Sequence, residues 1–164
     1  MSNAEARLCD QRDAAALQPA CRSFAPDGLD IIIDDASHVG EWSMISFEAL
    51  FPLLKSNGIY VIEDWGSSYW STWGDGAPYR PPTLLEPLVE HPAPNPVRHR
   101  RIASHDYGMV GFVKSLVDKL WVEWHVERIE FTPFFVVVHK LAHSEVLKRQ
   151  RKHLEMVAAA GKIC

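Results

Sequence analysis

The sequence has few cysteines and no long apolar stretch. Its three cysteines are too few and too scattered for a disulfide framework, and they lack the paired spacing of a zinc site. No apolar run approaches the roughly 20 residues that a membrane-spanning helix needs. We therefore expect reduced cysteines, no membrane partner and a cytoplasmic location.

Basic clusters and glycine-rich turns are also scarce. The formal charge is −4 and the basic patch at Arg98–Arg101 is short, so we expect no nucleic-acid partner. The nine glycines include no closely spaced trio between a strand and a helix, the pattern that holds a dinucleotide or a similar cofactor. A nucleotide-hydrolysing protein is disfavoured, because Ile31–Asp35 imitates a Walker B strand but no Gly-Lys-Ser/Thr phosphate loop accompanies it.

The composition is sufficient for one globular domain. A length of 164 residues and a hydrophobic content of 47% fit a single domain over residues 1–164. Most of the eleven prolines lie between Pro78 and Pro96. Because proline resists regular structure, we expect residues 65–105 to form an aromatic and proline-rich insertion or lid, with a short helix at Thr83–Glu90.

Between Leu29 and Asp64 the sequence predicts a strand, a helix and a second strand. The apolar run Ile31–Ile33 suits a buried parallel strand, and Gly58–Ile62 repeats the pattern. Between them, apolar residues recur at helical spacing, namely Trp42, Ile45, Ala49, Leu50, Leu53 and Leu54. Such a unit is almost always right-handed, so both strands open their carboxyl ends on one edge, where open α/β sheets bind ligands.

Each of these two strands ends on a pair of acidic residues. Asp34 and Asp35 follow the first strand, and Glu63 and Asp64 follow the second. Four carboxylates at close range repel one another, and a divalent cation with oxygen ligands offsets this repulsion. The alternative is that the acids are solvated loop residues or helix caps. Two acidic pairs, with His38 three residues after Asp35, favour the metal site.

Three stretches of this unit resemble a known family. Asp34–His38, Phe47–Leu54 and Gly58–Asp64 are similar to the metal-dependent class I S-adenosylmethionine O-methyltransferases. The groups concerned are those acting on macrolide sugars (mycinamicin VI and macrocin type), the rhamnosyl O-methyltransferases and the cephalosporin-hydroxylase-like proteins. The family usually reads Asp-Asp-Gly-Ser-His, and Ala36 departs from that pattern. The resemblance implies S-adenosylmethionine and magnesium as cofactors.

The resemblance also implies roles for individual residues. Carried over by position, the metal ligands would be Asp35, Glu63 and Asp64, and His38 would be the general base. Near the amino end, Asp10 and Gln11 lie in a segment that resembles the one beside the adenine of the methyl donor. Together with Asp34 they are the candidate cofactor-binding residues. A helix-capping role for Asp10 is the alternative.

An aromatic segment follows the second acidic pair. Trp65–Gly76 holds three tryptophans and one tyrosine among small residues. Aromatic faces stack on sugar rings, so we interpret the segment as an acceptor-binding lid with Trp65, Tyr69 and Trp70 as the contacts. The alternative is that these rings only pack onto the domain.

The carboxyl-terminal half predicts a helix at Tyr107–Leu120, an antiparallel hairpin at Val126–Phe131 and Phe134–Lys140, and a last helix at Ser144–Ala160. The fold class is therefore α/β. The resemblance implies a partial Rossmann-like class I methyltransferase fold, with parallel strands and a carboxyl-terminal antiparallel hairpin, that lacks the first strands.

In the family's strand order, 3-2-1-4-5-7-6, the strand containing Ile31–Ile33 sits beside the missing first strand. It would become an exposed apolar edge. We therefore expect a homo-oligomer that covers this strand.

Two functions follow from the resemblance. The first is an S-adenosylmethionine-dependent, magnesium-assisted O-methyltransferase that acts on a hydroxyl of a sugar or of a glycosylated small molecule. The second is a truncated, non-catalytic domain that binds a divalent metal but does not bind S-adenosylmethionine alone.

Overall fold

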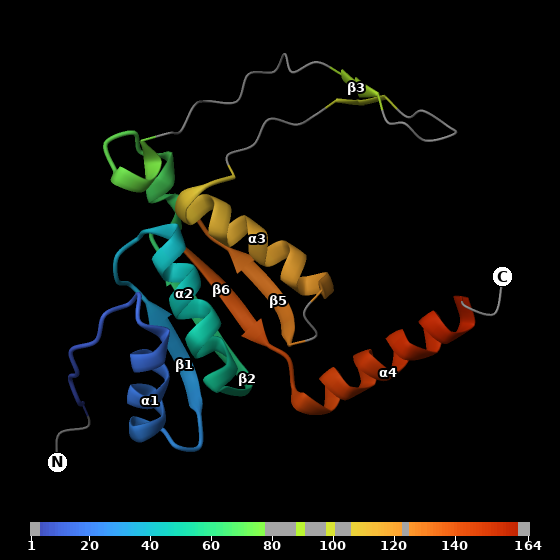
Figure 1. Ribbon diagram of the computed structural model, residues 1–164, viewed down its shortest axis with the longest axis horizontal. Coiled ribbons are helices and arrows are strands. Elements are labelled where there is room, and N and C mark those ends of the chain that lie inside the picture. Colours follow the sequence, from blue (N-terminus) through green and yellow to red (C-terminus); the bar gives the residue numbers. More distant parts are fainter. Residues whose placement is uncertain (1–3, 78–87, 91–97, 101–105, 123–124, 161–164) are drawn as a thin grey trace.

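The computed structural model describes residues 4–77, 88–90, 98–100, 106–122 and 125–160. The helices and strands follow one another along the chain as α1 (Ala14–Phe24), β1 (Leu29–Asp34), α2 (Gly40–Leu50), β2 (Leu54–Glu63), β3 (Leu88–Glu90), β4 (Arg98–Arg100), α3 (Gly108–Val122), β5 (Val126–Phe131), β6 (Phe135–Lys140) and α4 (His143–Ala160) (Figure 1). Short 3-10 helices are η1 (Phe51–Leu53), η2 (Trp65–Tyr69) and η3 (Gly74–Gly76). None of the helices in these residues has both the length and the apolar character needed to cross a membrane.

The main sheet has four strands in the order β1-β2-β6-β5. β1 and β2 are parallel, whereas β6 is antiparallel to both β2 and β5. β5 therefore runs in the same direction as β1 and β2, and only β6 is reversed. This topology confirms the predicted α/β fold, with a parallel pair and a carboxyl-terminal hairpin, and it agrees with 4-5-7-6 in the family's strand order. β3 and β4 form a separate antiparallel pair.

Helices α1, α2 and α3 lie on one face of the sheet (Figure 1). Alternate strand residues are buried under them, because side chains of a strand alternate between its two faces. The buried strand residues include Ile32, Tyr60, Ile62, Val136 and Val138, and their partners on α2 and α3 include Phe47, Phe112, Val113 and Leu116. Burying one such side chain stabilises the fold by about 1.5–3 kcal/mol. This core fixes the relative positions of the strand ends that carry the acidic residues.

β1 is an edge strand of the main sheet, as the sequence predicted. Ile31 and Ile33 point to the face opposite the helices, and they are 57% and 60% exposed. The backbone groups on the outer side of β1 have no neighbouring strand in the described sheet. This confirms the exposed apolar edge, while its covering by a second copy stays a prediction.

The helix of the strand–helix–strand unit is shorter than predicted. α2 ends at Leu50, and Leu54 already opens β2, four residues before the predicted start at Gly58. Pro52 lacks a backbone N–H and cannot continue an α-helix. The ammonium group of Lys140, from β6, then donates hydrogen bonds to carbonyl oxygens at this turn, those of Phe51 (3.3 Å), Pro52 (2.8 Å) and Leu54 (2.6 Å).

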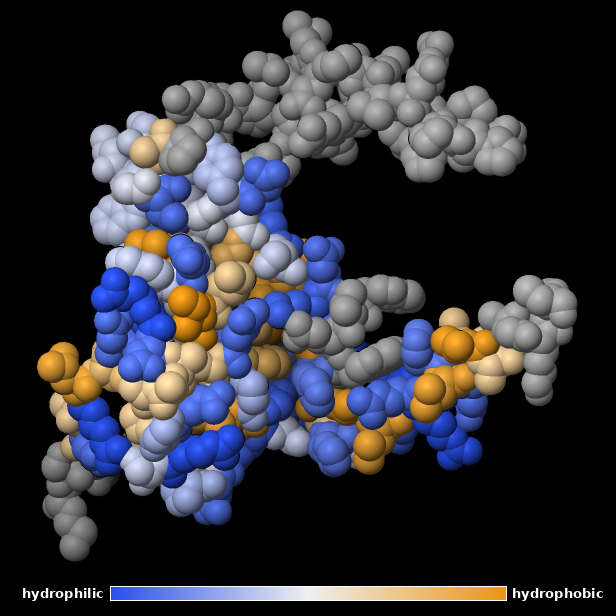
Figure 2. Space-filling model, in the orientation of Figure 1, coloured by the Kyte–Doolittle hydropathy of each residue, from blue (hydrophilic) through white to orange (hydrophobic). Residues whose placement is uncertain are grey.

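One of the two other predicted helices is absent at its end, and the other is present. The expected helix at Thr83–Glu90 is wrong at its end, because Leu88–Glu90 forms strand β3 through its pairing with β4; residues 83–87 lie outside the described residues. The helix predicted from Ser144 is present as α4, which begins one residue earlier and extends away from the sheet (Figure 1). Its apolar side chains Leu147, Leu154, Met156 and Val157 are exposed. Figure 2 shows apolar surface along α4.

Candidate functional site

The carboxyl ends of β1 and β2 bring together side chains that are far apart in the sequence. Asp34 pairs with Ile62 in the parallel register, so Asp35 and Asp64 follow adjacent strand ends. One carboxylate oxygen of Asp35, one of Asp64 and a ring nitrogen of His38 all lie within 4.8 Å of one another. His38 Nε2 is 3.5 Å from Asp35 Oδ1. We call Asp35, His38 and Asp64 the rim group.

Glu63 is not part of the rim group. It is the last residue of β2 and pairs with Phe135 of β6. Adjacent strand residues point to opposite faces, and Ile62 is fully buried under the helices, so Glu63 lies on the other face. Asp64 leaves the strand in a left-handed conformation with φ of 49°, and its N–H donates to Phe134 O at 2.7 Å. The ligand role predicted for Glu63 stays a prediction.

Asp34 points inward rather than to the rim. It is 8% exposed and accepts hydrogen bonds from Gln11 Nε2 at 3.0 Å and from the Tyr60 hydroxyl at 3.4 Å. Burial raises the pKa of Asp34 because it disfavours the charged form, and hydrogen bonds from Ser43 and Tyr60 partly oppose this. Burial and the nearby Asp34 carboxylate also raise the pKa of Tyr60. Asp34 therefore links Gln11 to the buried Tyr60 through hydrogen bonds.

The structure separates the other two residues predicted to bind the methyl donor. Asp10 is exposed and forms an ion pair with Arg12 at 2.7 Å, and the hydrogen bonds from Arg12 hold the pKa of Asp10 at about 2. Gln11 contacts Asp34, and its buried Oε1 has no hydrogen-bond partner within the part of the chain that the structure describes. An orphaned buried acceptor fits a ligand that carries an N–H donor, as the amino group of adenine does.

The three predicted aromatic contacts have different environments. The indole N–H of Trp65 donates to Thr132 O at 2.8 Å, and its ring makes edge contacts with Tyr69 and Phe131 at centroid distances of 6.3 and 6.1 Å. Trp65 thus packs against the β5–β6 turn. Trp70 is 58% exposed, so its ring is accessible to a ligand.

A fourth aromatic residue, Trp73, contacts His38 of the rim group. Its indole N–H donates to His38 O at 3.1 Å, and the two rings meet edge to face at a centroid distance of 6.2 Å. Trp73 belongs to the aromatic segment predicted from the sequence but is not one of its three predicted contacts. The contact spans 35 residues, and no local pattern predicts it.

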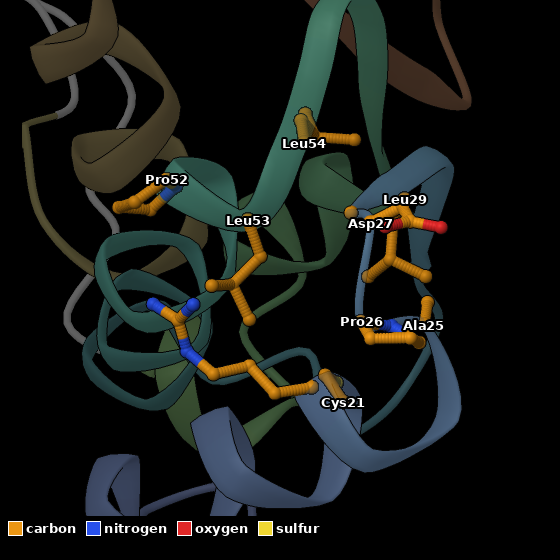
Figure 3. A pocket seen from close by; sticks show the side chains of 10 residues that line it. Cys21, Ala25, Pro26, Asp27, Leu29, Pro52, Leu53 and Leu54 are labelled. Atoms are coloured by element: carbon orange, nitrogen blue, oxygen red, sulfur yellow. The ribbon is translucent and has the colours of Figure 1, made fainter.

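A cavity of about 230 Å³ opens at the other end of the strands. Leu29 and Leu54, the first residues of β1 and β2, line it together with Cys21 of α1 and Leu53 of η1 (Figure 3). Because the rim group follows the carboxyl ends of the same strands, the cavity and the rim group are at opposite ends of the sheet. The cavity is not part of the candidate site.

Comparison with known proteins identifies relatives, although no protein-family model matches the chain. The chain is 32% identical over 126 residues to mycinamicin VI 2''-O-methyltransferase of Micromonospora griseorubida, which covers 74% of this chain and 30% of that protein. It is 39% identical over 146 residues to 8-demethyl-8-(2-methoxy-alpha-L-rhamnosyl)-tetracenomycin-C 3'-O-methyltransferase of Streptomyces olivaceus, with coverages of 86% and 31%.

A solved structure shows the same relationship in three dimensions. The MycE methyltransferase from the mycinamycin biosynthetic pathway, in complex with Mg, SAH and mycinamycin VI, matches with a TM-score of 0.58 and 28% identity, over 82% of this chain and 31% of that chain. This chain therefore spans about a third of the length of these relatives. The resemblance read from the sequence is confirmed: the chain is related in sequence and in fold to part of the macrolide sugar O-methyltransferases.

Proposed function

We propose that the chain is the metal-binding part of an S-adenosylmethionine-dependent, magnesium-assisted O-methyltransferase that acts on a hydroxyl of a glycosylated small molecule. The observation that carries this proposal is the rim group. Its two carboxylates and one imidazole follow the ends of two adjacent strands, and their ligand atoms lie within 4.8 Å of one another. The related MycE structure contains Mg, SAH and mycinamycin VI, which supports the proposed cofactors and the class of acceptor.

The donor set of the rim group fits magnesium, which prefers carboxylate oxygens. Asp35 and Asp64 would hold the ion, and the resemblance adds Glu63 as a third ligand. A bound Mg²⁺ ion would act as a Lewis acid that makes a sugar hydroxyl easier to deprotonate. His38 takes the hydroxyl proton on a ring nitrogen, since histidine exchanges protons near neutral pH. The Asp35 carboxylate, 3.5 Å from His38 Nε2, balances the positive charge that His38 gains.

The methyl donor would bind beside the interior network of the site. Gln11 supplies an orphaned acceptor, and Asp34 fixes the Gln11 amide through its hydrogen bond. The glycine-rich turn that normally completes such a cofactor site is not found in these 164 residues. The second candidate function, a domain that binds the metal but not the donor alone, follows from that observation.

The acceptor would meet the aromatic segment. Tyr69 and Trp70 are the proposed contacts, because they follow the rim residue Asp64 and the Trp70 ring is exposed. Trp65 is less suited, since its ring and its N–H are used in packing against the β5–β6 turn. The role of residues 65–105 as a lid and a cytoplasmic location stay predictions.

Isothermal titration calorimetry tests the proposal and separates the two candidates. Titrating Mg²⁺ into the chain is expected to give a binding signal, because the rim carboxylates are already close together. S-adenosylmethionine is then titrated into the magnesium-saturated chain. Donor binding at micromolar strength supports the methyltransferase, whereas magnesium binding alone supports the second candidate. A chain that binds neither contradicts both.

We also propose that two copies associate through β1. An edge strand with two exposed isoleucines is a ready template for pairing with another strand. Ile33→Lys places a charge on this edge and is expected to convert the dimer into a monomer in analytical ultracentrifugation. Leu154→Lys, on the exposed side of α4, is the matched control and should leave the dimer intact. A wild-type monomer at high concentration would contradict the proposal.

A further inference from the structure

The carboxylate of Asp75, beyond the rim group, meets the beginnings of two helices. Its Oδ2 accepts hydrogen bonds from the backbone N–H of Gly40 at 3.2 Å and from that of Met109 at 2.5 Å. The hydroxyl of Ser68 donates to the same oxygen at 2.7 Å. Gly40 is the first residue of α2, and Met109 is the second residue of α3. One side chain of the aromatic segment thus joins both helix N-termini.

The chemistry of helix ends explains why a carboxylate occupies this place. The first N–H groups of a helix have no partner within the helix, and the helix dipole favours a negative charge there. The residue that caps α2 is Val39, whose side chain makes no capping hydrogen bond. Asp75, which is 35 residues away in the sequence, therefore supplies the capping acceptor that Val39 does not provide.

Two glycines allow the helices to converge on this carboxylate. A Cβ atom on Gly40 would overlap the carbonyl group of Gly108. Gly108 has φ of 62°, a left-handed conformation that glycine adopts without a penalty. A Cβ atom there would overlap the carboxylate of Asp75 itself. The close approach of the two helices thus requires glycine at both positions.

A second contact links the same segment to His38. Trp73 precedes Asp75 by two residues, as His38 precedes Gly40 by two. Trp73 donates to His38 O at 3.1 Å, and Gly40 N–H donates to Asp75, so two hydrogen bonds tie residues 73 and 75 to residues 38 and 40. His38 has φ of 51°, a left-handed conformation that residues other than glycine adopt uncommonly.

We propose that Asp75 and Trp73 are positioning residues that hold His38 in the rim group. Asp75 fixes the start of α2 and Trp73 fixes the His38 carbonyl, so that the imidazole stays beside Asp35. Neither residue is among the proposed metal ligands or the proposed acceptor contacts Tyr69 and Trp70. The proposal rests on the proposed function, because His38 needs a fixed position toward a hydroxyl only if it acts as the base.

The side-chain NMR signals of His38 report directly on this role. In ¹H–¹⁵N spectra of the imidazole rings, assigned with a His38→Gln variant, Asp75→Ala and Trp73→Phe are both expected to shift the His38 signals. Asp75→Asn should restore the wild-type positions, because its amide oxygen still accepts from the backbone N–H groups. Asp118→Ala, which removes an exposed carboxylate on α3, is the matched control and should shift nothing.

The outcomes separate this proposal from the proposed function. Unchanged His38 signals in both Asp75→Ala and Trp73→Phe would overturn the positioning role. If Asp75→Ala does not fold, Trp73→Phe decides alone, because it removes the indole N–H and retains an aromatic ring. The readout is then the nuclear Overhauser contacts of the His38 ring, which a change of ring current does not alter: changed contacts support the role and unchanged contacts overturn it. The spectra need neither metal nor methyl donor, so a chain that fails to bind Mg²⁺ would refute the proposed function without deciding this result.

Discussion

Asp35→Ala and Asp64→Ala are each expected to abolish the thermal stabilisation of the chain by Mg²⁺. A ligand that binds only the folded state at a hundred times its dissociation constant stabilises that state by about 2.7 kcal/mol. For a domain of this size, about 1 kcal/mol corresponds to roughly 2–4 °C in Tm, so a shift of about 5–10 °C should be lost. The physical reason is that Asp35 and Asp64 supply the two carboxylates of the rim group. Differential scanning fluorimetry with and without Mg²⁺ measures the effect.

Two further variants are controls for this test, and a third tests the ligand role of Glu63. Asp30→Ala removes an exposed carboxylate near the opposite end of β1, paired with Lys55, and should leave the magnesium shift unchanged. His38→Ala should also retain the shift if His38 is a base rather than a ligand. The resemblance predicts a loss for Glu63→Ala, although Glu63 lies on the other face of the sheet. A retained shift in both Asp35→Ala and Asp64→Ala would refute the ligand assignment.

Gly40→Ala is expected to destabilise the fold by about 3 kcal/mol, the upper end of the usual overpacking effect. Helix propensity alone predicts the opposite sign, since alanine is favoured over glycine in a helix by about 1 kcal/mol. The steric effect is larger here, because the new methyl group would overlap the backbone of Gly108, which cannot rotate away as a side chain can. Urea unfolding followed by circular dichroism measures the change.

Gly74→Ala is the matched control for Gly40→Ala. Apart from Gly74 and its two chain neighbours, no atom of the described structure lies within 4 Å of a Cβ atom built on Gly74, so its effect should stay within about 0.5 kcal/mol. Equal midpoints for wild type and Gly40→Ala would show that the two helix N-termini can separate without loss of stability. The close approach of α2 and α3 would then not contribute to the fold.

The sequence was sufficient to place the four strands of the main sheet, and the family resemblance supplied their order. Runs of β-branched residues such as Ile31–Ile33 and Val136–Val138 determine strands locally, and the handedness rule then places both acidic strand ends on one edge. The end of α2 was not predictable with the same accuracy. It depends on Pro52, which is local, but also on Lys140, whose ammonium group reaches the turn from β6.

The candidate site was predicted in part, because it lies where the strands end. Asp34 and Glu63 are the last residues of β1 and β2 and point to opposite faces of the sheet, whereas Asp35 and Asp64 lie beyond the strand ends. The handedness rule brings all four carboxylates to one edge of the sheet but does not say which face each one occupies. The positioning roles proposed for Trp73 and Asp75 could not be predicted from the sequence. Their partners lie 35 residues away, and nothing in the local pattern marks either residue.

The left-handed backbone at His38 and Asp64 restricts how this site can be redesigned. Asparagine, aspartate and histidine tolerate that conformation better than other residues with a Cβ atom, whereas β-branched residues are strongly disfavoured. Substituting Asn at position 64 would therefore retain the course of the chain, while Val or Ile would distort it before any change in ligand chemistry took effect. Directed evolution toward a different cation would have to begin from this short list of side chains.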